Sequence, residues 1–335
     1  MDAVKLALVG VGRMGEIHAS NAIGLKGKAL VVAIVDSVIE RAEAVAKLVS
    51  DAKVYESVDR MLMAVDVDAA IVSVPNNIQL SIVEQLVDNG IHILCEKPVG
   101  LIPEHLEELA LKAERKNVQI HAGYNRPFDQ GYEKAKNFVE SGGVGKVTYI
   151  HSQTLDPEPP KGWEADPTKS GGIFFTTCVH DFQTVIYLTG RRVQKVRATG
   201  SVYVHDDLRS RGDFDDVFVK LWLDNGVVAT VRANRFCSYG HDVRVEVYGT
   251  RGAIRIEQES HTPIKYYGAE GVLTDYPYWF QTRFWDSYKR ELEYFIKAVS
   301  EGLRPRVSAF EAAHILRVAR AAHESAKNMS EVVVA

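Results

Sequence analysis

The chain has 335 residues, of which 46% are hydrophobic and 25% charged, with a formal net charge of −4. This mild negative charge gives no electrostatic reason to expect nucleic acid or an anionic membrane as a partner. The composition is typical of a soluble globular protein, and the length suits two domains better than one small core.

A glycine-rich turn follows the first predicted strand. Residues 5–9 form a short apolar run that predicts a buried parallel strand, and a G-x-G-x-x-G motif comes directly after it. In such a motif the first glycine allows a tight turn, the second lets the backbone approach a pyrophosphate, and the third permits close helix packing. A helix from about Met14 would direct its free N–H groups toward the phosphates. The cofactor contacts expected here are Gly10, Gly12, Arg13, Met14 and Gly15. The alternative is a tight turn in another kind of α/β protein.

The next predicted strand, residues 30–35, ends at Asp36. An acid about 20 residues beyond the glycines is placed to bind the adenosine ribose hydroxyls, and its charge would repel a 2′-phosphate. We therefore expect NAD rather than NADP. Ser37 and Arg41 keep NADP open as the less favoured cofactor, because a small polar residue and an arginine can accommodate the extra phosphate. Asp36 could also cap the following helix, and the two roles are compatible.

Strands and helices alternate through the first 125 residues. Further strands are expected at residues 69–74, 92–96 and 118–122, with helices near 40–48, 78–87 and 103–116. This alternation predicts a parallel, doubly wound α/β sheet, whose ligands bind beyond the carboxyl ends of its strands. Other cofactor contacts expected at these ends are Ser37, Ser73, Val74, Pro75, Asn76, Glu96 and Lys97.

The pattern changes after residue 126. A helix at about 131–139 precedes strand-like segments separated by Gly and Asn/Asp turns, at residues 147–153, 193–204, 217–223, 227–236, 243–248 and 253–257. Helices near 285–299 and 309–326 close the chain. We expect an α+β domain with a large, open, mostly antiparallel sheet, and hence domains at residues 1–125 and 126–335.

Localisation and metal binding are constrained by what the sequence lacks. No apolar run reaches the ~18 residues of a membrane-spanning helix. The first predicted strand begins too early to leave room for a signal peptide, so we expect a cytoplasmic protein. Cys95, Cys178 and Cys237 are odd in number and widely spaced, which argues against a disulfide framework and a zinc cluster. We expect no metal.

Several short motifs occur together along the chain. They are residues 10–15, Glu96-Lys97-Pro98, the run Gly-Tyr-Asn-Arg-Pro-Phe-Asp at 123–129, Gly171-Gly172-Ile173, and His180-Asp181-Phe182. With these motifs, the chain resembles the glucose–fructose oxidoreductase/inositol dehydrogenase (Gfo/Idh/MocA) family over nearly its full length. Residues 154–156 and 239–242 are most similar to the inositol dehydrogenase branch. The resemblance implies a Rossmann domain followed by an open-faced sheet domain, and a homo-oligomer, a dimer or a tetramer, formed through that sheet.

Lys97 and His180 are the candidate catalytic residues. Oxidation of a secondary alcohol needs hydride transfer to the nicotinamide and loss of the hydroxyl proton, and histidine titrates in the range that suits the base. Lys97 can hydrogen-bond the same oxygen and stabilise developing alkoxide character. The resemblance implies the same two roles. The alternatives are a surface lysine at a strand end and a histidine on a buried helix face.

The expected substrate contacts are polar and neutral or singly charged, as a polyhydroxylated ring requires: Asn125, Arg126, Thr154, Asp156, Thr176 and Tyr239. Thr176 departs from the family, whose inositol-type members usually carry aspartate four residues before the histidine. If another acid takes over, Asp156 and Asp181 are the candidates. Gln79 is a second departure, where the family often has histidine, and the sequence supports no functional conclusion from it.

These observations favour one function over two alternatives. We expect NAD-dependent oxidation of a secondary hydroxyl of a cyclic polyol or sugar, with inositol as the leading substrate. An NADP-linked sugar or ketone reductase of the same family is the first alternative. The second is a regulator that binds NAD without catalysis. Only Thr176 favours that regulator. The presence of both Lys97 and His180 argues against it, because a protein that only binds NAD needs neither side chain.

Overall fold

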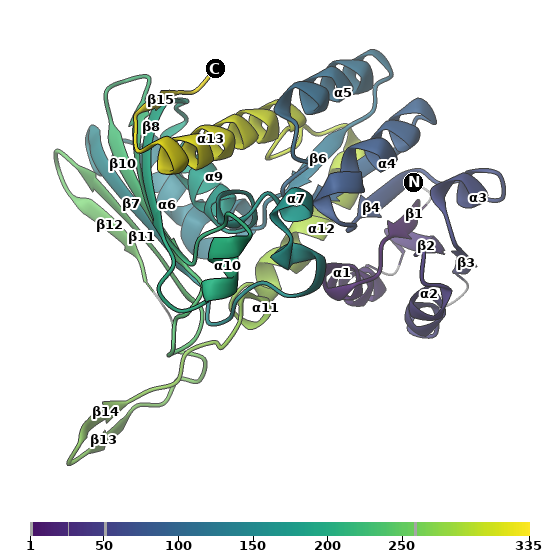
Figure 1. Cartoon of the computed structure of the whole chain (residues 1–335). Helices are drawn as coiled ribbons and strands as arrows, with labels where there is room; N and C mark the ends of the chain where they lie inside the picture. Colours follow the sequence, from purple (N-terminus) through teal and green to yellow (C-terminus); the bar gives the residue numbers. More distant parts are fainter. Residues whose placement is uncertain (1–2, 26, 50–51, 258–259) are drawn as a thin grey trace. The chain divides into compact units, whose positions relative to one another are not determined.

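The computed structural model (Figure 1) describes residues 3–25, 27–49, 52–257 and 260–335. Its contacts divide the chain into two compact units. The first contains the described residues up to Asn125 together with Asp286–His314, and the second contains Arg126–Trp285 and the residues from Ile315 onward.

The first unit is built on a six-stranded sheet in the order β3-β2-β1-β4-β5-β6, with every neighbouring pair parallel. The strands are β1 Val4–Val9, β2 Ala29–Val35, β3 Lys53–Tyr55, β4 Ala69–Val72, β5 His92–Glu96 and β6 Ile120–Gly123. The helices of its N-terminal segment are α1 Arg13–Ile23, α2 Ile39–Ala46, α3 Val58–Leu62, α4 Asn76–Asp88 and α5 Pro103–Arg115. The predicted parallel, doubly wound sheet is confirmed. The strands are mostly apolar because helices cover both faces of such a sheet.

Helix α12 (Trp285–Glu301) changes the expected division of the chain. Its residues Leu292, Phe295 and Ile296 pack into the same core as the strand residues Leu6 and Ile34. Asp286–His314 was expected in the second domain, whereas the structure places this segment in the first unit. The physical reason is that α12 has a broad apolar face, and that face is buried in the core of the first unit.

The second unit contains a seven-stranded sheet in the order β12-β11-β7-β10-β9-β8-β15. Its strands are β7 Val147–Leu155, β8 Val193–Ser201, β9 Asp216–Leu223, β10 Val228–Asn234, β11 Asp242–Gly249, β12 Ala253–Ile256 and β15 Val332–Val333. The predicted open, mostly antiparallel sheet is confirmed, with one exception. Strands β7 and β10 are parallel, and Leu155 pairs with Asn234 at their ends.

One face of this sheet carries helices (Figure 1). Helix α9 (Cys178–Thr189) packs on β7 and β10, and α6 (Gln130–Glu140) packs on α9 and β12. The remaining elements are η1 Arg126–Phe128, η2 Gly162–Ala165, α7 Pro167–Ser170, α8 Ile173–Thr176, α10 Asp206–Ser210, α11 Phe280–Arg283, α13 Ala309–Asn328 and a hairpin of β13 Tyr266–Gly268 and β14 Gly271–Leu273. Among the described residues, no helix is both long and apolar enough to cross a membrane.

Candidate active site

The glycine turn between β1 and α1 has the geometry of a phosphate cradle. Gly10 has a φ of +82°, and a Cβ there would lie 2.6 Å from the carbonyl oxygen of Ser73. A Cβ on Gly15 would lie 2.1 Å from the carbonyl oxygen of Gly10, so neither position accepts a side chain. A Cβ on Gly12 would meet nothing within 4 Å. The space beside Gly12, at the N-terminus of α1, therefore fits a pyrophosphate held by backbone N–H groups. Arg13 is exposed and Met14 half-buried at the start of this helix.

Asp36 connects the end of β2 to this turn. Its Oδ2 accepts a hydrogen bond from the backbone N–H of Val11 (2.9 Å), and its Oδ1 accepts one from Val38 (2.9 Å). The alternative role as an N-cap is wrong, because α2 begins at Ile39 with Val38 at the cap position. Each carboxylate oxygen keeps a second lone pair, so Asp36 can still accept from ribose hydroxyls. Ser37 and Arg41 are both exposed next to it.

Gln79 holds the segment that carries Lys97. From α4, its Nε2 donates to the carbonyl oxygen of Glu96 (3.0 Å), and its Oε1 accepts from the backbone N–H of Gly100 (2.7 Å). One buried amide thus bonds both ends of the turn, within which Lys97 is half-buried. The turn at the end of β4 lies in the same unit, with Ser73, Val74 and Pro75 half-buried and Asn76 buried.

A buried group of titratable residues lies beside this turn. Nε2 of His18 is 2.7 Å from Oε1 of Glu96, and both side chains are buried. Glu291 of α12 is buried as well, and neither of its carboxyl oxygens has a hydrogen-bond partner among the described residues. Burial, reinforced by the charge of Glu96, raises the pKa of Glu291 well above its ordinary value. This group was not predicted from the sequence, because His18 and Glu291 lie on helices outside any of the recognised motifs.

His180 lies in the first turn of α9, half-buried, and its neighbour Asp181 is fully buried. Oδ1 of Asp181 accepts hydrogen bonds from Nη1 of Arg126 (2.9 Å), Ser152 (2.6 Å) and Thr154 (3.1 Å). Arg126 and Thr154 are each 2% exposed. These two predicted substrate contacts are therefore part of an internal ion-pair network beneath the helix that carries His180.

Asn125 and Tyr239 lie in different surroundings. Asn125, in the first unit, is buried and its Nδ2 donates to Oγ of Ser287 (3.2 Å). Tyr239, in the second unit, is half exposed, and its hydroxyl donates to Oδ2 of Asp242 (2.7 Å). Burial, together with the bond to Asp242, raises the pKa of the Tyr239 hydroxyl.

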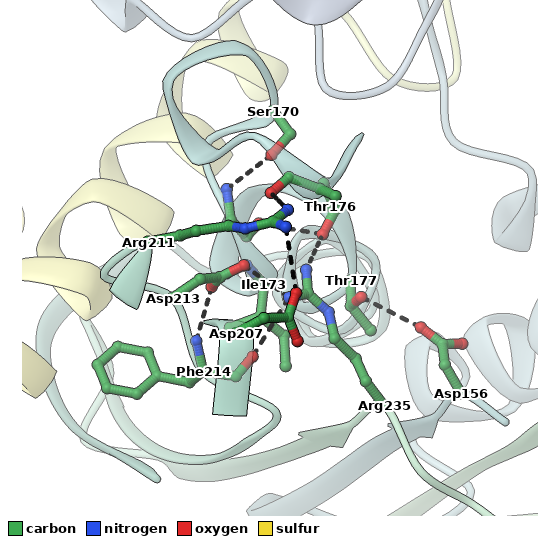
Figure 2. Close-up of polar contacts among 12 residues, drawn as sticks. Asp156, Ser170, Ile173, Thr176, Thr177, Asp207, Arg211, Asp213, Phe214 and Arg235 are labelled. Carbon is green, nitrogen blue, oxygen red and sulfur yellow. Dashed lines mark hydrogen bonds and ion pairs between the residues drawn. The ribbon is translucent and has the colours of Figure 1, made fainter. Parts of the chain in front are cut away.

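Thr176 and Thr177, which precede α9, are each bonded by a charged side chain (Figure 2). Nη2 of Arg235 donates to Oγ1 of Thr176 (3.0 Å), while the Thr177 hydroxyl donates to Oδ2 of Asp156 (3.2 Å). Arg235 is also ion-paired with Asp213 (2.6 Å). Arg235 and Asp213 were not predicted as site residues. The one available signal was the position of Arg235 near the end of the predicted strand at residues 227–236.

No metal site accompanies these groups in the described residues, where no cluster of three or more His, Cys, Asp or Glu could hold an ion. The cysteines at 95, 178 and 237 are free and buried. Burial raises the pKa of the Cys95 and Cys178 thiols, which keeps them protonated.

A backbone cradle after β1, an acid after β2 and a lysine after β5 define a dinucleotide-dependent oxidoreductase. Residues 4–124 match the oxidoreductase family with an NAD-binding Rossmann fold, and residues 132–255 match the GFO/IDH/MocA C-terminal domain. The chain belongs to the GFO/IDH/MocA family. The predicted family and the predicted cofactor, NAD, are thus confirmed.

Characterised relatives extend over the whole chain. It is 31% identical over 338 residues to a myo-inositol 2-dehydrogenase of Thermotoga maritima, covering 98% of each chain. It is 32% identical over 326 residues to a scyllo-inositol 2-dehydrogenase (NAD(+)) of Bacillus subtilis, covering 97% of this chain and 94% of the other. Among solved structures, a scyllo-inositol dehydrogenase of Lactobacillus casei with bound NAD(H) and scyllo-inositol aligns with a TM-score of 0.93 at 26% identity, over 99% of each chain.

Proposed function

We propose that this enzyme oxidises a secondary hydroxyl of a cyclic polyol, with an inositol as the leading substrate. The observation that carries the proposal is the end-to-end similarity to inositol 2-dehydrogenases in a chain that keeps both Lys97 and His180. A protein that only bound NAD would need neither side chain.

The roles of the residues follow from the chemistry of the reaction. NAD, when bound, accepts the hydride. His180 takes the hydroxyl proton as general base, and Lys97 donates a hydrogen bond to the same oxygen and stabilises its alkoxide character. Gly12 and the first N–H groups of α1 hold the pyrophosphate, and Asp36 accepts from the ribose hydroxyls. Asn125 and Tyr239 are further candidate substrate contacts. Arg126 and Thr154 act from the interior, because they bond Asp181 on the helix that carries His180.

We further propose that the enzyme forms a homo-oligomer, a dimer or a tetramer, through the sheet face opposite α9. Aromatic side chains lie on that face. Phe218 is 45% exposed, and the rings of Tyr149 and Tyr248 stand 5.9 Å apart. Exposed aromatic groups on a flat face favour association. The mass in solution, measured by light scattering, tests this, and a monomer would exclude it. A cytoplasmic location stays a prediction.

The function is tested by NADH formation with purified protein, NAD and a panel of inositols, glucose and xylose, with NADP in parallel. We expect turnover with NAD on an inositol and none for Lys97→Ala. Turnover on open-chain sugars alone, or with NADP alone, would reject the inositol or the cofactor assignment. NAD binding without any turnover would favour the non-catalytic regulator.

A further inference from the structure

Three carboxylates surround the turn that leads into the His180 helix, and two of them are committed to internal contacts. Asp181 is 0% exposed and accepts from Arg126, Ser152 and Thr154. Asp213 has a side chain 3% exposed, paired with Arg235 and bonded to the backbone N–H of Ile173. The Asp156 side chain is 16% exposed. Of these three acids, Asp156 is the one that a ligand can touch.

Thr176 cannot provide the missing acid, and its hydroxyl is already engaged. Its Oγ1 donates to the carbonyl oxygen of Gly172 (3.0 Å) and accepts from Nη2 of Arg235 (3.0 Å). A hydroxyl has one hydrogen to donate, so none is left for a substrate. Position 176, where inositol-type members usually carry aspartate, is therefore occupied here by a threonine that is bonded to the buried guanidinium of Arg235.

Asp156 and Arg235 reach this turn from adjacent strands. Leu155 and Asn234 are paired on the parallel strands β7 and β10, so the next residues, Asp156 and Arg235, emerge side by side at one edge of the sheet. Figure 2 shows Asp156 directed at Thr177 and Arg235 directed at Thr176. Two consecutive threonines are thus held by two opposite charges.

The other oxygen of the Asp156 carboxylate lies close to a histidine. Oδ1 of Asp156 lies 3.0 Å from Nδ1 of His241, which is buried. The His241 imidazole packs against the rings of Trp279, Phe280 and Phe284, at centroid distances of 5.9–6.3 Å. An acid that accepts a hydrogen bond from buried Thr177 and lies against a buried imidazole is pre-organised, which is what a substrate subsite requires.

We propose that Asp156, bonded by Thr177 and placed beside His241, is the acid of the substrate subsite, and that Arg235 is a positioning residue for the turn at Thr176. In this chain the acid is at the end of β7, whereas inositol-type members usually carry it at the position of Thr176. This inference rests on the proposed function and deepens it. Asp156 accepts a hydrogen bond from a ring hydroxyl, and its charge selects neutral polyols over sugar acids.

The position of Asp156 also has a consequence for the pH profile. Thr177, which donates to the carboxylate, lies three residues before His180, so Asp156→Asn would remove a negative charge from the turn that leads into the helix of the proposed base. The other charged groups around this turn are Asp181 with Arg126 and Asp213 with Arg235, and each carboxylate there is neutralised by its arginine. The buried thiols of Cys178 and Cys237 stay protonated, because burial raises the pKa of both.

Asp156→Asn tests the inference, because it keeps the shape of the side chain and removes the charge. We expect kcat/KM for the best inositol to fall by about 10- to 100-fold, the loss of one hydrogen bond to a charged group. The acid limb of its pH profile should move to lower pH. Asp216→Asn is the matched control, since Asp216 is similarly exposed (18%) and paired with Arg232. That control should leave kcat/KM and the pH profile unchanged.

A second variant tests whether the carboxylate must be at position 156 or whether a carboxylate at position 176 serves equally well. In Asp156→Asn/Thr176→Asp, the new carboxylate would be paired with Arg235, so we expect no recovery of kcat/KM. Recovery to near wild-type activity would overturn the inference, as would an Asp156→Asn enzyme with unchanged kcat/KM and pH profile. A wild-type enzyme that neither turns over nor binds any inositol in calorimetry would reject the proposed function, and this inference with it.

Discussion

His18 and Glu96 form a buried pair directly before Lys97, with 2.7 Å between Nε2 of the imidazole and Oε1 of the carboxyl. The carbonyl oxygen of the same Glu96 accepts a hydrogen bond from Gln79. The residue next to the proposed catalytic lysine is therefore held through both its side chain and its backbone. Two of these contacts come from helices, α1 and α4, which are rigid elements suited to positioning a site.

Removal of the Gln79 amide should impair catalysis more than cofactor binding. Gln79→Leu loses both bonds that hold the turn around Lys97. We expect kcat to fall by about 10- to 100-fold, since a displacement of ~1 Å can cost this much. The dissociation constant of NAD should change little in a fluorescence titration. Gln85→Leu on the same helix is the control. An unchanged kcat in Gln79→Leu would show that the clamp does not position the lysine, and Gln79→His should retain more activity than Gln79→Leu.

Glu291→Gln should stabilise the protein at alkaline pH. The folded state raises the pKa of Glu291 above its ordinary 4.5, so the unfolded chain ionises first. The folded protein therefore loses stability as pH rises from about that value toward the raised pKa. Glutamine cannot ionise and escapes this loss.

The measurement is the melting temperature of both proteins from pH 5 to 9. Each pH unit between the ordinary and the raised pKa should widen the difference in favour of Glu291→Gln by about 1.4 kcal/mol, or about 2–4 °C, and the difference should level off above the raised pKa. Glu293→Gln, an exposed change on the same helix, should show no such trend. A variant less stable than wild type by the same amount at every pH would mean that the Glu291 carboxyl is not held protonated.

Arg126→Met should act through stability. The change leaves the buried Asp181 carboxylate without its cation, which costs about 3–5 kcal/mol when one partner of a buried pair is removed. A clear drop in the urea midpoint is expected, and Arg126→Met/Asp181→Asn should recover part of it. If Arg126→Met instead raised KM for the polyol without lowering the midpoint, direct substrate binding by Arg126 would be supported.

Asp36 should set the preference between NAD and NADP. Asp36→Ser removes the charge that repels a 2′-phosphate, and like charges ~4 Å apart cost about 1 kcal/mol even in water. We expect the ratio of kcat/KM for NAD to that for NADP to fall by at least about fivefold, because a factor of ten corresponds to about 1.4 kcal/mol. The Val11 backbone bond is lost as well, so activity with NAD should also decrease. Asp59→Ser, at an exposed helix position, should leave the ratio intact, and an unaltered ratio for Asp36→Ser would exclude its role in cofactor choice.

The first unit was largely predictable because its signals are local. An apolar strand followed by spaced glycines determines both the turn and the helix that follows, as Gly10 and Gly15 illustrate through the space that a Cβ would need. Strand periodicity, in contrast, does not tell which strands become neighbours. The parallel pairing of β7 with β10 was therefore not foreseen, although it brings Asp156 and Arg235 together.

Residue type was a poorer guide to the surroundings of charged groups. Arg126 has a side chain that could bind a polar substrate, yet it is buried and paired with Asp181, 55 residues later. Arg235 and Asp213 are likewise paired where the antiparallel strands β9 and β10 meet at the end away from their connecting turn. A buried charge depends on a distant partner, and a single sequence without contacts does not reveal that partner.

The packing of α12 against β1 and β2 has a consequence for biosynthesis. Leu292, Phe295 and Ile296 belong to the same core as Leu6, so that core joins segments that lie far apart in the sequence. A ribosome releases residues 1–125 long before Asp286–His314 exist. Until Asp286–His314 is synthesised, the apolar surface that α12 covers stays exposed on the nascent cofactor-binding segment. The first unit therefore cannot be moved into another protein as one contiguous segment.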